Sequence, residues 1–428
     1  MFSDGTWGAR QTAVKSLDLL MRFKTVRQRS VGVCAPLSVE DHALQSMADT
    51  SPAKWHLAHT TWFFEAFVLG PIGQPRHDER FGELFNSYYN SVGPRVDRAR
   101  RGLMSRPSLD EVHAYRAAVD ERVLAALDVD ALGAGEQATL ELGLHHEQQH
   151  QELLMTEIKH ALATQPLQPQ YRGDLDRLAH GSITPLSWVD FDGGIVEIGA
   201  EERGFAFDNE RPRHRAVIEP FTLASRPVCN AEVIAFVADG GYTDPRHWLS
   251  DGFATAQRTG WRAPLYWHHD DGVWMHYELA GIRELDPAAT ACHLSYYEAD
   301  AIARWANARL PTEAEWEIAA KGLRPREGNW ADDDHLHPRA ATGSGLAQMF
   351  GDFWEWTSSA YAPYPGFAPL AGALGEYNGK FMSGQMVLRG GSCFTPRGHV
   401  RSSYRNFFPP WARWQMAGVR FANDRGVR

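Results

Sequence analysis

The chain changes character about 160 residues from its start, and this change constrains the fold more than any other feature of its 428 residues. The first part reads as amphipathic helices, whereas the last part is rich in Gly, Trp and short β-like pieces such as GGIVEIG (193–199). Between them, residues 166–187 contain three prolines and little periodicity, which is typical of a linker. We therefore predict a helical domain over 1–165, a linker over 166–187 and a mixed α and β domain over 188–428.

Four segments of the first part can be helical: 12–33, 52–69, 108–128 and about 136–162. The third begins with Ser108 three residues before Glu111, the pattern of a capping box. It then places five apolar side chains on one stripe: Val112, Tyr115, Val119, Val123 and Leu127. Four such helices predict a bundle, in which cofactor sites form from side chains on facing helices. The last part shows one clear helical stretch, 295–310.

Composition excludes several classes of protein. A net charge of -10 and the lack of a long Lys/Arg run argue against a nucleic-acid partner. The four cysteines have no CxxC spacing, which indicates neither a zinc ribbon nor a disulfide framework and favours a reducing cytoplasm. The N-terminus has no apolar signal core, and no 18-residue apolar run occurs, so no membrane segment is predicted.

The stretch HHEQQHQE (145–152) places His146 and His150 one turn apart on one helix face, with Cβ atoms roughly 5–6 Å apart. Two such imidazoles can share one metal, although a chance pair has the same spacing. A third ligand is expected from a facing helix, and His59 is the candidate because it shares its face with aromatic side chains in WHLAHTTWFFE (55–65). Three neutral imidazoles suit Zn(II), Fe(II) or Cu(II) and leave positions open for substrate and oxygen.

The neighbouring histidines, His56 and His145, lie on different faces and are predicted to support the ligands rather than bind the metal. The same stretch offers a competing hypothesis, because HEQQH matches the H-E-x-x-H of zinc peptidases, in which the glutamate acts as general base. Glu157 would then be the third ligand. The longer H-x-x-G-x-x-H extension is absent, since residues 150–156 read HQELLMT, so this alternative is open but not favoured.

Longer motifs make the chain recognisable. SPAKWHLAHTTWFFE (51–65), FNSYYNSVGPR (85–95) and GLHHEQQHQELLMTEIKH (143–160) resemble the bacterial sulfoxide synthases of ergothioneine biosynthesis. The second half resembles the catalytic domain of that family, which is similar to formylglycine-generating enzyme, through four pieces: FDNERPRH (207–214), HLSYYEADAIARWANARLPTEAEWE (293–317), GDFWEWTSS (351–359) and VLRGGSCFTPRGHVRSSYRNFFPPWARWQMAGVRFA (387–422). The resemblance implies an α+β chain: an N-terminal DinB-like four-helix bundle and a C-terminal C-type-lectin-like domain, with the metal at their interface.

The resemblance also implies a mononuclear non-haem iron(II) enzyme that uses O2 to join a cysteine sulfur to C2 of the imidazole of hercynine, the Nα-trimethylated histidine. The product is a sulfoxide. Carried over by motif, the iron ligands are His59, His146 and His150, and Gln149 contacts hercynine. Tyr88 and Tyr89 jointly fit the role of the proton donor that prevents direct oxidation of the thiolate to sulfinate.

By the same resemblance, Asn406 and Phe407 hold the amino-acid end of hercynine and Phe408 lines the pocket. Arg95 and Arg98 are candidate anchors for the carboxylate of the thiol substrate, although a solvated basic helix end has the same pattern. Relatives that use γ-glutamylcysteine carry a charge pair in the region that matches RNFFPPWARW, and this chain does not, so free cysteine is favoured.

Other members of the wider group set the alternatives. Ovothiol-type and selenoneine-type synthases share the same iron site, and substrate trials separate them from a hercynine enzyme. Cys393 stands alone near the C-terminus, whereas formylglycine-generating enzymes need a pair of cysteines there, so that activity is not expected. A non-catalytic carbohydrate or peptide binder built on the lectin-like half is the hypothesis from a different class.

Overall fold

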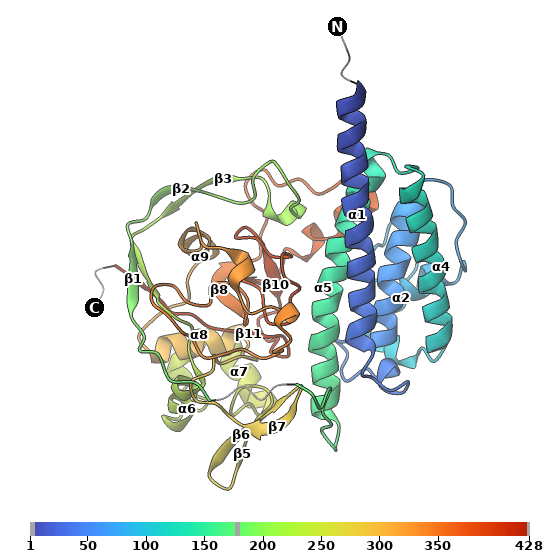
Figure 1. Ribbon diagram of the computed structural model, residues 1–428. Coiled ribbons are helices and arrows are strands. Elements are labelled where there is room, and N and C mark those ends of the chain that lie inside the picture. The colour runs from blue at the N-terminus through green and yellow to red at the C-terminus, as the bar shows by residue number, and fades with distance from the viewer. Residues whose placement is uncertain (1–4, 176–179, 426–428) are drawn as a thin grey trace. The chain divides into compact units, whose positions relative to one another are not determined.

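The computed structural model describes residues 5–175 and 180–425 (Figure 1). The chain divides into two compact units, Met1–Ala161 and Leu162–Arg428. The described residues of the first unit form helices and loops, and the second combines small sheets with short helices. The α+β fold class predicted from the sequence is therefore confirmed. Among the residues described, no helix combines the length and the apolar character needed to cross a membrane.

The described residues of the first unit include four α-helices of 12 residues or more, which form a bundle (Figure 1). These are α1 (Gly5–Cys34), α2 (Ala53–Phe64), α4 (Leu109–Asp128) and α5 (Ala134–Thr164). Shorter helical pieces join them: η1 (Asp41–Ala43), the π-helical η2 (Glu65–Leu69), α3 (Phe81–Phe85) and η3 (Arg98–Leu103). All four helices predicted from the sequence are present, and each predicted range overlaps its helix closely because the apolar periodicity that predicts the helix is also what buries it.

Local chemistry explains why these helices begin and pack where they do. The predicted capping box of α4 is formed: Ser108 Oγ accepts a hydrogen bond from Glu111 N at 3.2 Å, and the Glu111 carboxylate accepts one from Ser108 N at 2.7 Å. Every residue of α2 is buried, so this helix lies in the middle of the unit. Helix α5 approaches it closely at Gly143, where a Cβ atom would lie 2.5 Å from the Phe64 ring.

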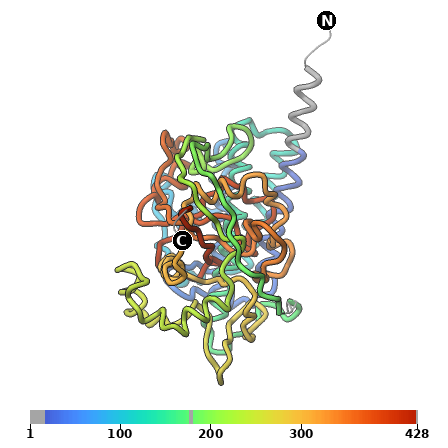
Figure 2. Tube along the Cα trace, turned by 90° about the vertical axis from the view of Figure 1, so that its left-hand side faces the viewer, coloured from blue at the N-terminus to red at the C-terminus, as the bar shows by residue number. Residues whose placement is uncertain are grey.

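The described residues of the second unit form four sheets. One orders β1 (Trp188–Phe191), β4 (Phe221–Ala224) and β12 (Ala422–Asp424); another orders β10 (Asn406–Phe408), β9 (Met386–Arg389), β8 (Trp354–Ala360) and β11 (Ala417–Gly418). The other two pair β2 (Gly194–Ile198) with β3 (His214–Ile218), and β5 (Trp267–Asp270) with β6 (Val273–Glu278) and β7 (Gly281–Glu284). The β5–β6 hairpin extends from its unit as a narrow loop (Figure 2).

Within the part of this unit that the structure describes, the sheets are accompanied by the helices α6 (Asn230–Ala238), α7 (Ser250–Thr259), α8 (Tyr296–Trp305) and α9 (Glu313–Ala319). The predicted strand within 193–199 is β2. The helix predicted over 295–310 ends early, at Trp305, because Asn307 adopts a left-handed backbone (φ 53°) and Arg309 pairs with Ala422 as an isolated bridge. Short 3-10 turns complete the unit: Asp208–Glu210, Pro245–His247, Pro325–Glu327, Ala331–Asp333, Gly372–Glu376 and Gly379–Phe381.

Candidate metal centre

Three histidines meet in the core of the helical unit. His59 comes from α2, and His146 and His150 come from α5. Each offers one ring nitrogen, and the three nitrogens lie within 4.8 Å of one another. Nε2 of His59 is 3.2 Å from Nε2 of His146, and two nitrogen ligands of one metal ion stand about 3 Å apart. The structure therefore brings together the three residues that the sequence singles out, at a separation that fits a shared metal.

A backbone carbonyl orients the first of these imidazoles. His59 Nδ1 lies 2.6 Å from the carbonyl oxygen of Phe85, at the end of α3. Because a carbonyl can only accept, Nδ1 must donate, and in a neutral imidazole Nε2 then carries the lone pair. That lone pair is on the nitrogen that faces His146. A hydrogen bond of this kind to the far ring nitrogen is what fixes the tautomer of metal-binding histidines.

A chain of two hydrogen bonds orients the third imidazole in the same way. His56 Nε2 is 2.8 Å from the Glu157 carboxylate, and His56 Nδ1 is 2.8 Å from Nδ1 of His150. The carboxylate accepts, so His56 donates through Nε2 and, when neutral, accepts through Nδ1. His150 must then donate through Nδ1, which leaves the lone pair on its Nε2. His56 thus occupies the supporting position expected from the sequence, and His145 instead lies 3.4 Å from Arg22 Nη2.

Burial keeps the three imidazoles neutral. His59 is fully buried, and His146 and His150 are nearly so. Desolvation lowers the pKa of His59 and of His150 well below the usual value, and neighbouring imidazoles lower it further. Desolvation also lowers the pKa of His146, to about 3. The unprotonated imidazole is the form that binds metal, so the site is ready for a cation at neutral pH.

Aromatic rings cover the cluster. Trp55 stacks on His59 with ring centroids 4.6 Å apart and planes 9° apart, and Trp62 stacks on the same imidazole at 5.7 Å. The Phe63 ring lies 4.6 Å from His146. These rings shield the imidazoles from water and restrict their orientation.

Glu147, the glutamate of the H-E-x-x-H pattern, is committed to the bundle core. Its carboxylate accepts hydrogen bonds from Arg27 at 2.9 Å, from Ser30 at 2.5 Å and from Arg116. Burial opposes ionisation, but Arg116 and Arg27 outweigh it and lower the pKa of Glu147 to about 2. Glu157 is likewise engaged by His56 and by the backbone N of Ser51. The arrangement therefore does not favour the zinc-peptidase alternative, which needs Glu147 as a base and Glu157 as a ligand.

The tyrosine pair lies in the loop that follows α3, the helix whose last residue, Phe85, orients His59 through its carbonyl. Asn86 fixes this loop by accepting from Tyr89 N and donating to Tyr89 O, both at 3.0 Å. Tyr89 is buried, with its ring 5.7 Å from Trp62, and Tyr88 packs on Tyr89 with centroids 4.6 Å apart. The pair therefore belongs to the aromatic layer around the histidines.

The arginines of VGPRVDRARR (92–101) differ in how far they are buried. Arg95 and Arg98, the two predicted anchors, are exposed. Arg101, which was not among the predicted anchors, is buried with its guanidinium 3.5 Å over the Trp55 ring. It donates hydrogen bonds to the hydroxyls of Ser51 and Ser87. No sequence signal separates Arg101 from its neighbours in RARR, because its burial depends on where the loop crosses α2. Gln149, on α5 beside His150, is half-buried.

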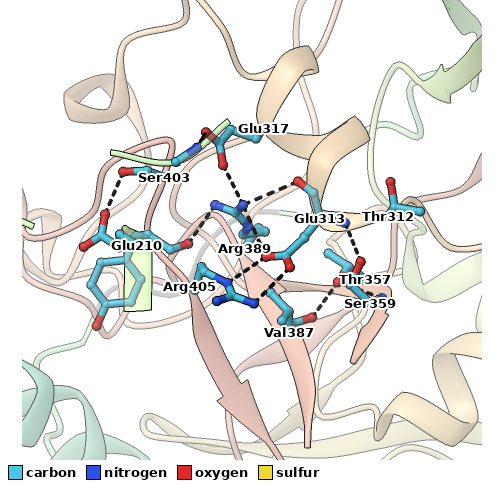
Figure 3. Close-up of polar contacts among 12 residues, drawn as sticks. Glu210, Thr312, Glu313, Glu317, Thr357, Ser359, Val387, Arg389, Ser403 and Arg405 are labelled. Carbon is cyan, nitrogen blue, oxygen red and sulfur yellow. Dashed lines mark hydrogen bonds and ion pairs between the residues drawn. The ribbon is translucent and has the colours of Figure 1, made fainter. Parts of the chain in front are cut away.

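The remaining predicted residues, Asn406, Phe407 and Phe408, form β10 in the second unit and are half-buried. Phe407 stacks on Tyr361 with centroids 4.0 Å apart. The preceding Arg405 donates two hydrogen bonds to Glu313, at 2.9 and 3.0 Å (Figure 3). Figure 3 also shows Arg389 bound to Glu313 and Glu317, so buried ion pairs hold the strand that carries the predicted hercynine residues.

Two family models match this chain. The DinB superfamily model matches residues 22–154, and that of the sulfatase-modifying factor enzyme 1-like domain matches 184–344 and 340–425. Fold and site therefore define a two-part enzyme with a DinB-type helical unit and a sulfatase-modifying-factor-type unit. The hercynine oxygenase of Mycolicibacterium thermoresistibile is 33% identical over 417 residues, with 87% of each chain covered. That of Mycobacterium tuberculosis is 32% identical over 405 residues, covering 87% of this chain and 91% of the relative.

The chain belongs to the hercynine oxygenase family, and it is an oxygenase enzyme. A formylglycine-generating enzyme from Streptomyces coelicolor is also similar, at 29% identity, but it covers only 54% of this chain. The family resemblance drawn from the sequence motifs is therefore confirmed, and the match to hercynine oxygenases extends over both units.

Proposed function

We propose that this enzyme is a non-haem iron(II), O2-dependent sulfoxide synthase that joins the sulfur of cysteine to C2 of the hercynine imidazole. The observation that carries the proposal is the buried cluster of three neutral histidines, His59, His146 and His150, in a chain similar over most of its length to hercynine oxygenases. Small-molecule substrates follow from the same relatives. The spacing of the cysteines favours a reducing cytoplasm as the compartment.

The donor set fits iron(II). Three neutral imidazoles without a thiolate or carboxylate leave a cation its full positive charge and several open positions. Iron bound there would supply redox chemistry with O2 and hold a substrate thiolate beside the second substrate. The hydrogen bonds from His59 to Phe85 and from His150 to His56 keep the required lone pairs directed at one point.

The side chains around the metal must supply a proton at the right stage of the reaction. Direct oxidation of cysteine to sulfinate competes with sulfoxide formation, and a timely proton diverts the reaction toward carbon–sulfur bond formation. Tyr88 and Tyr89 are the proposed donors, each holding its proton on the phenol oxygen. Their position supports this role, because the loop that Asn86 fixes carries both tyrosines and directly follows Phe85, whose carbonyl orients His59.

The substrates need complementary groups. Hercynine combines a quaternary ammonium with a carboxylate, so aromatic faces and hydrogen-bond donors suit it. Asn406 and Phe407 are proposed to hold its amino-acid end, Phe408 to line the pocket and Gln149 to contact it from α5. The exposed guanidinium groups of Arg95 and Arg98 are proposed anchors for the carboxylate of the thiol.

Free cysteine is proposed over γ-glutamylcysteine. Phe408 and Ala412 stand where relatives that accept γ-glutamylcysteine carry an acidic and a basic residue, so this chain lacks a charge pair for the γ-glutamyl group. Ovothiol-type and selenoneine-type reactions use the same metal ligands and are distinguished only by substrate trials.

The test is anaerobic loading with Fe(II), then addition of air, hercynine and cysteine, with mass spectrometry of the products. We expect a hercynyl-cysteine sulfoxide that disappears in His150→Ala and persists in His160→Ala. His160 is the control because it lies on the same helix and is not one of the three clustered histidines; its Nδ1 is 2.7 Å from Ser46 Oγ. Formation of cysteine sulfinate alone would overturn the assignment of hercynine, and histidine, γ-glutamylcysteine and a selenosugar would be tried next. If zinc restored activity and iron did not, the assignment of iron as the metal would be overturned.

A further inference from the structure

A second group of metal-binding side chains lies in the other unit. His276 and Glu278 are alternate residues of β6, so both project from the same face of the strand. His337 reaches them from the loop that follows the turn at Ala331–Asp333. None of these residues belongs to the histidine cluster of the helical unit, and the proposed sulfoxide synthase chemistry does not use them.

The three side chains converge on one oxygen atom. Glu278 Oε1 is 2.9 Å from His276 Nε2 and 3.3 Å from His337 Nε2. The two imidazole centroids are 5.2 Å apart, with planes inclined by 71°, and the three ligand atoms lie within 4.8 Å of one another. Ligands of a tetrahedral zinc ion stand about 3.3 Å apart. A small outward movement of each side chain would therefore admit the ion.

The cluster is sheltered, yet two of its residues line a cavity. His276 and His337 are buried, and Glu278 is half-buried. Glu278 and His337 also line a cavity of about 560 Å³. The cavity gives a metal at this cluster room for a fourth ligand, water or a small anion. Its wall includes Arg283 and Arg339, which suit an anion bound to the metal.

The nearest printed charge contacts the other oxygen of the same carboxylate. Arg283 Nε is 3.7 Å from Glu278 Oε2, whereas both imidazoles face Oε1. The backbone of His337 is fixed by a 3.0 Å hydrogen bond from Asn329 Nδ2 to its carbonyl oxygen. Two imidazoles and one carboxylate held in this way are the protein ligand set of several zinc sites with one open position.

We propose that His276, Glu278 and His337 bind a divalent transition metal of the zinc class, with the open coordination position facing the cavity. The protein would then carry two metal ions of different kinds, one held by three histidines and one by two histidines and a glutamate. A hydrogen-bonded His–Glu–His group without metal has similar geometry, and metal stoichiometry separates the two.

The experiment measures bound metal in the full chain after chelator treatment, incubation with excess Zn(II) and gel filtration. We expect two zinc ions per chain in the wild type, and one in the His276→Gln, His337→Gln double variant. His268→Gln is the matched control because His268 is exposed on the adjacent strand β5, and it should keep both ions. Two ions per chain in the double variant, or one ion in both the wild type and the double variant, would overturn the proposal.

A second measurement covers the case in which the double variant does not fold. Glu278→Gln preserves size and one acceptor oxygen but removes the charge that a zinc ion requires. In a His146→Ala, His150→Ala background, which removes the first cluster, we expect Zn(II) to raise the melting temperature and Glu278→Gln to weaken zinc binding at least tenfold. An absence of zinc-dependent stabilisation in that background, with circular dichroism showing a folded chain, would also overturn the proposal.

Discussion

The Nδ1 atoms of His56 and His150 lie 2.8 Å apart. Two imidazole nitrogens at this distance share one hydrogen, so one ring must donate and the other must accept. Glu157, 2.8 Å from the opposite nitrogen of His56, decides which. The Glu157 carboxylate, which lies outside the histidine cluster, thus fixes the tautomer of the proposed ligand His150 through His56.

Removing the middle member of this chain tests its role. His56→Phe should lower metal affinity about 10- to 100-fold, because His150 would lose the partner that fixes its tautomer. Titration with Fe(II) or Co(II) under anaerobic conditions measures the change. His160→Ala on α5 is the control and should bind metal normally. Unchanged affinity in a folded His56→Phe variant would show that the chain does not orient His150.

Glu147 should matter for stability and not for metal binding. In Glu147→Gln, the buried guanidinium of Arg116 loses its carboxylate partner and that of Arg27 keeps only Asp120, which costs about 3–5 kcal/mol in the free energy of unfolding. Urea denaturation measures this loss. Glu141→Gln, on the same helix as Glu147, is the control. It removes a partly exposed ion pair with Arg22 of α1 and should cost less than about 1 kcal/mol. Lost turnover with unchanged stability in Glu147→Gln would instead favour the peptidase hypothesis.

The same carboxylate predicts how stability depends on pH. The pKa of Glu147 falls from its ordinary 4.5 to about 2 in the folded chain. Its contribution, about 3 kcal/mol, is present in full above pH 4.5 and is lost as pH falls toward 2, because only the unfolded chain takes up the proton in that range. The difference in unfolding free energy between wild type and Glu147→Gln should therefore shrink between pH 5 and pH 3. A constant difference would contradict the assignment.

The tyrosine pair predicts a change of product. Tyr89→Phe and Tyr88→Phe remove one phenol proton each, and the variant that removes the true donor should slow sulfoxide formation about 100-fold or more. Cysteine sulfinate should replace the sulfoxide, while bound iron stays constant. Mass spectrometry gives the product ratio. Tyr297→Phe, in the other unit, is the control. An unaltered ratio in the Tyr88, Tyr89 double variant would exclude both residues as donors.

Arg405 should affect hercynine binding through the strand it anchors. Arg405→Met leaves Glu313 without its two hydrogen bonds and loosens β10, which carries Asn406 and Phe407. The KM for hercynine should rise about tenfold, equivalent to about 1.4 kcal/mol, with a smaller effect on kcat. Arg425→Met removes an exposed ion pair with Asp192 and should change neither parameter. An unchanged KM in Arg405→Met would place hercynine elsewhere.

Part of this molecule is determined by local sequence. The repeat of apolar side chains along 108–128 predicts both the helix and its buried stripe, because the helical period alone selects one face. The spacing of His146 and His150 likewise places both imidazoles on one face of α5. The early end of α8 was not predictable in this way, because Asn307 leaves the helix where Arg309 pairs with the distant Ala422.

The sequence by itself therefore determined the two-part architecture, the helices of the bundle and the three histidines that meet within it. Only the tertiary structure decided what surrounds them: Glu157 and His56 fix a tautomer, Glu147 neutralises two buried arginines, and Arg101 covers Trp55. The physical reason is that periodicity specifies the face on which a side chain lies. Its hydrogen-bond partners come from segments far away in the chain, and their approach depends on how the whole unit packs.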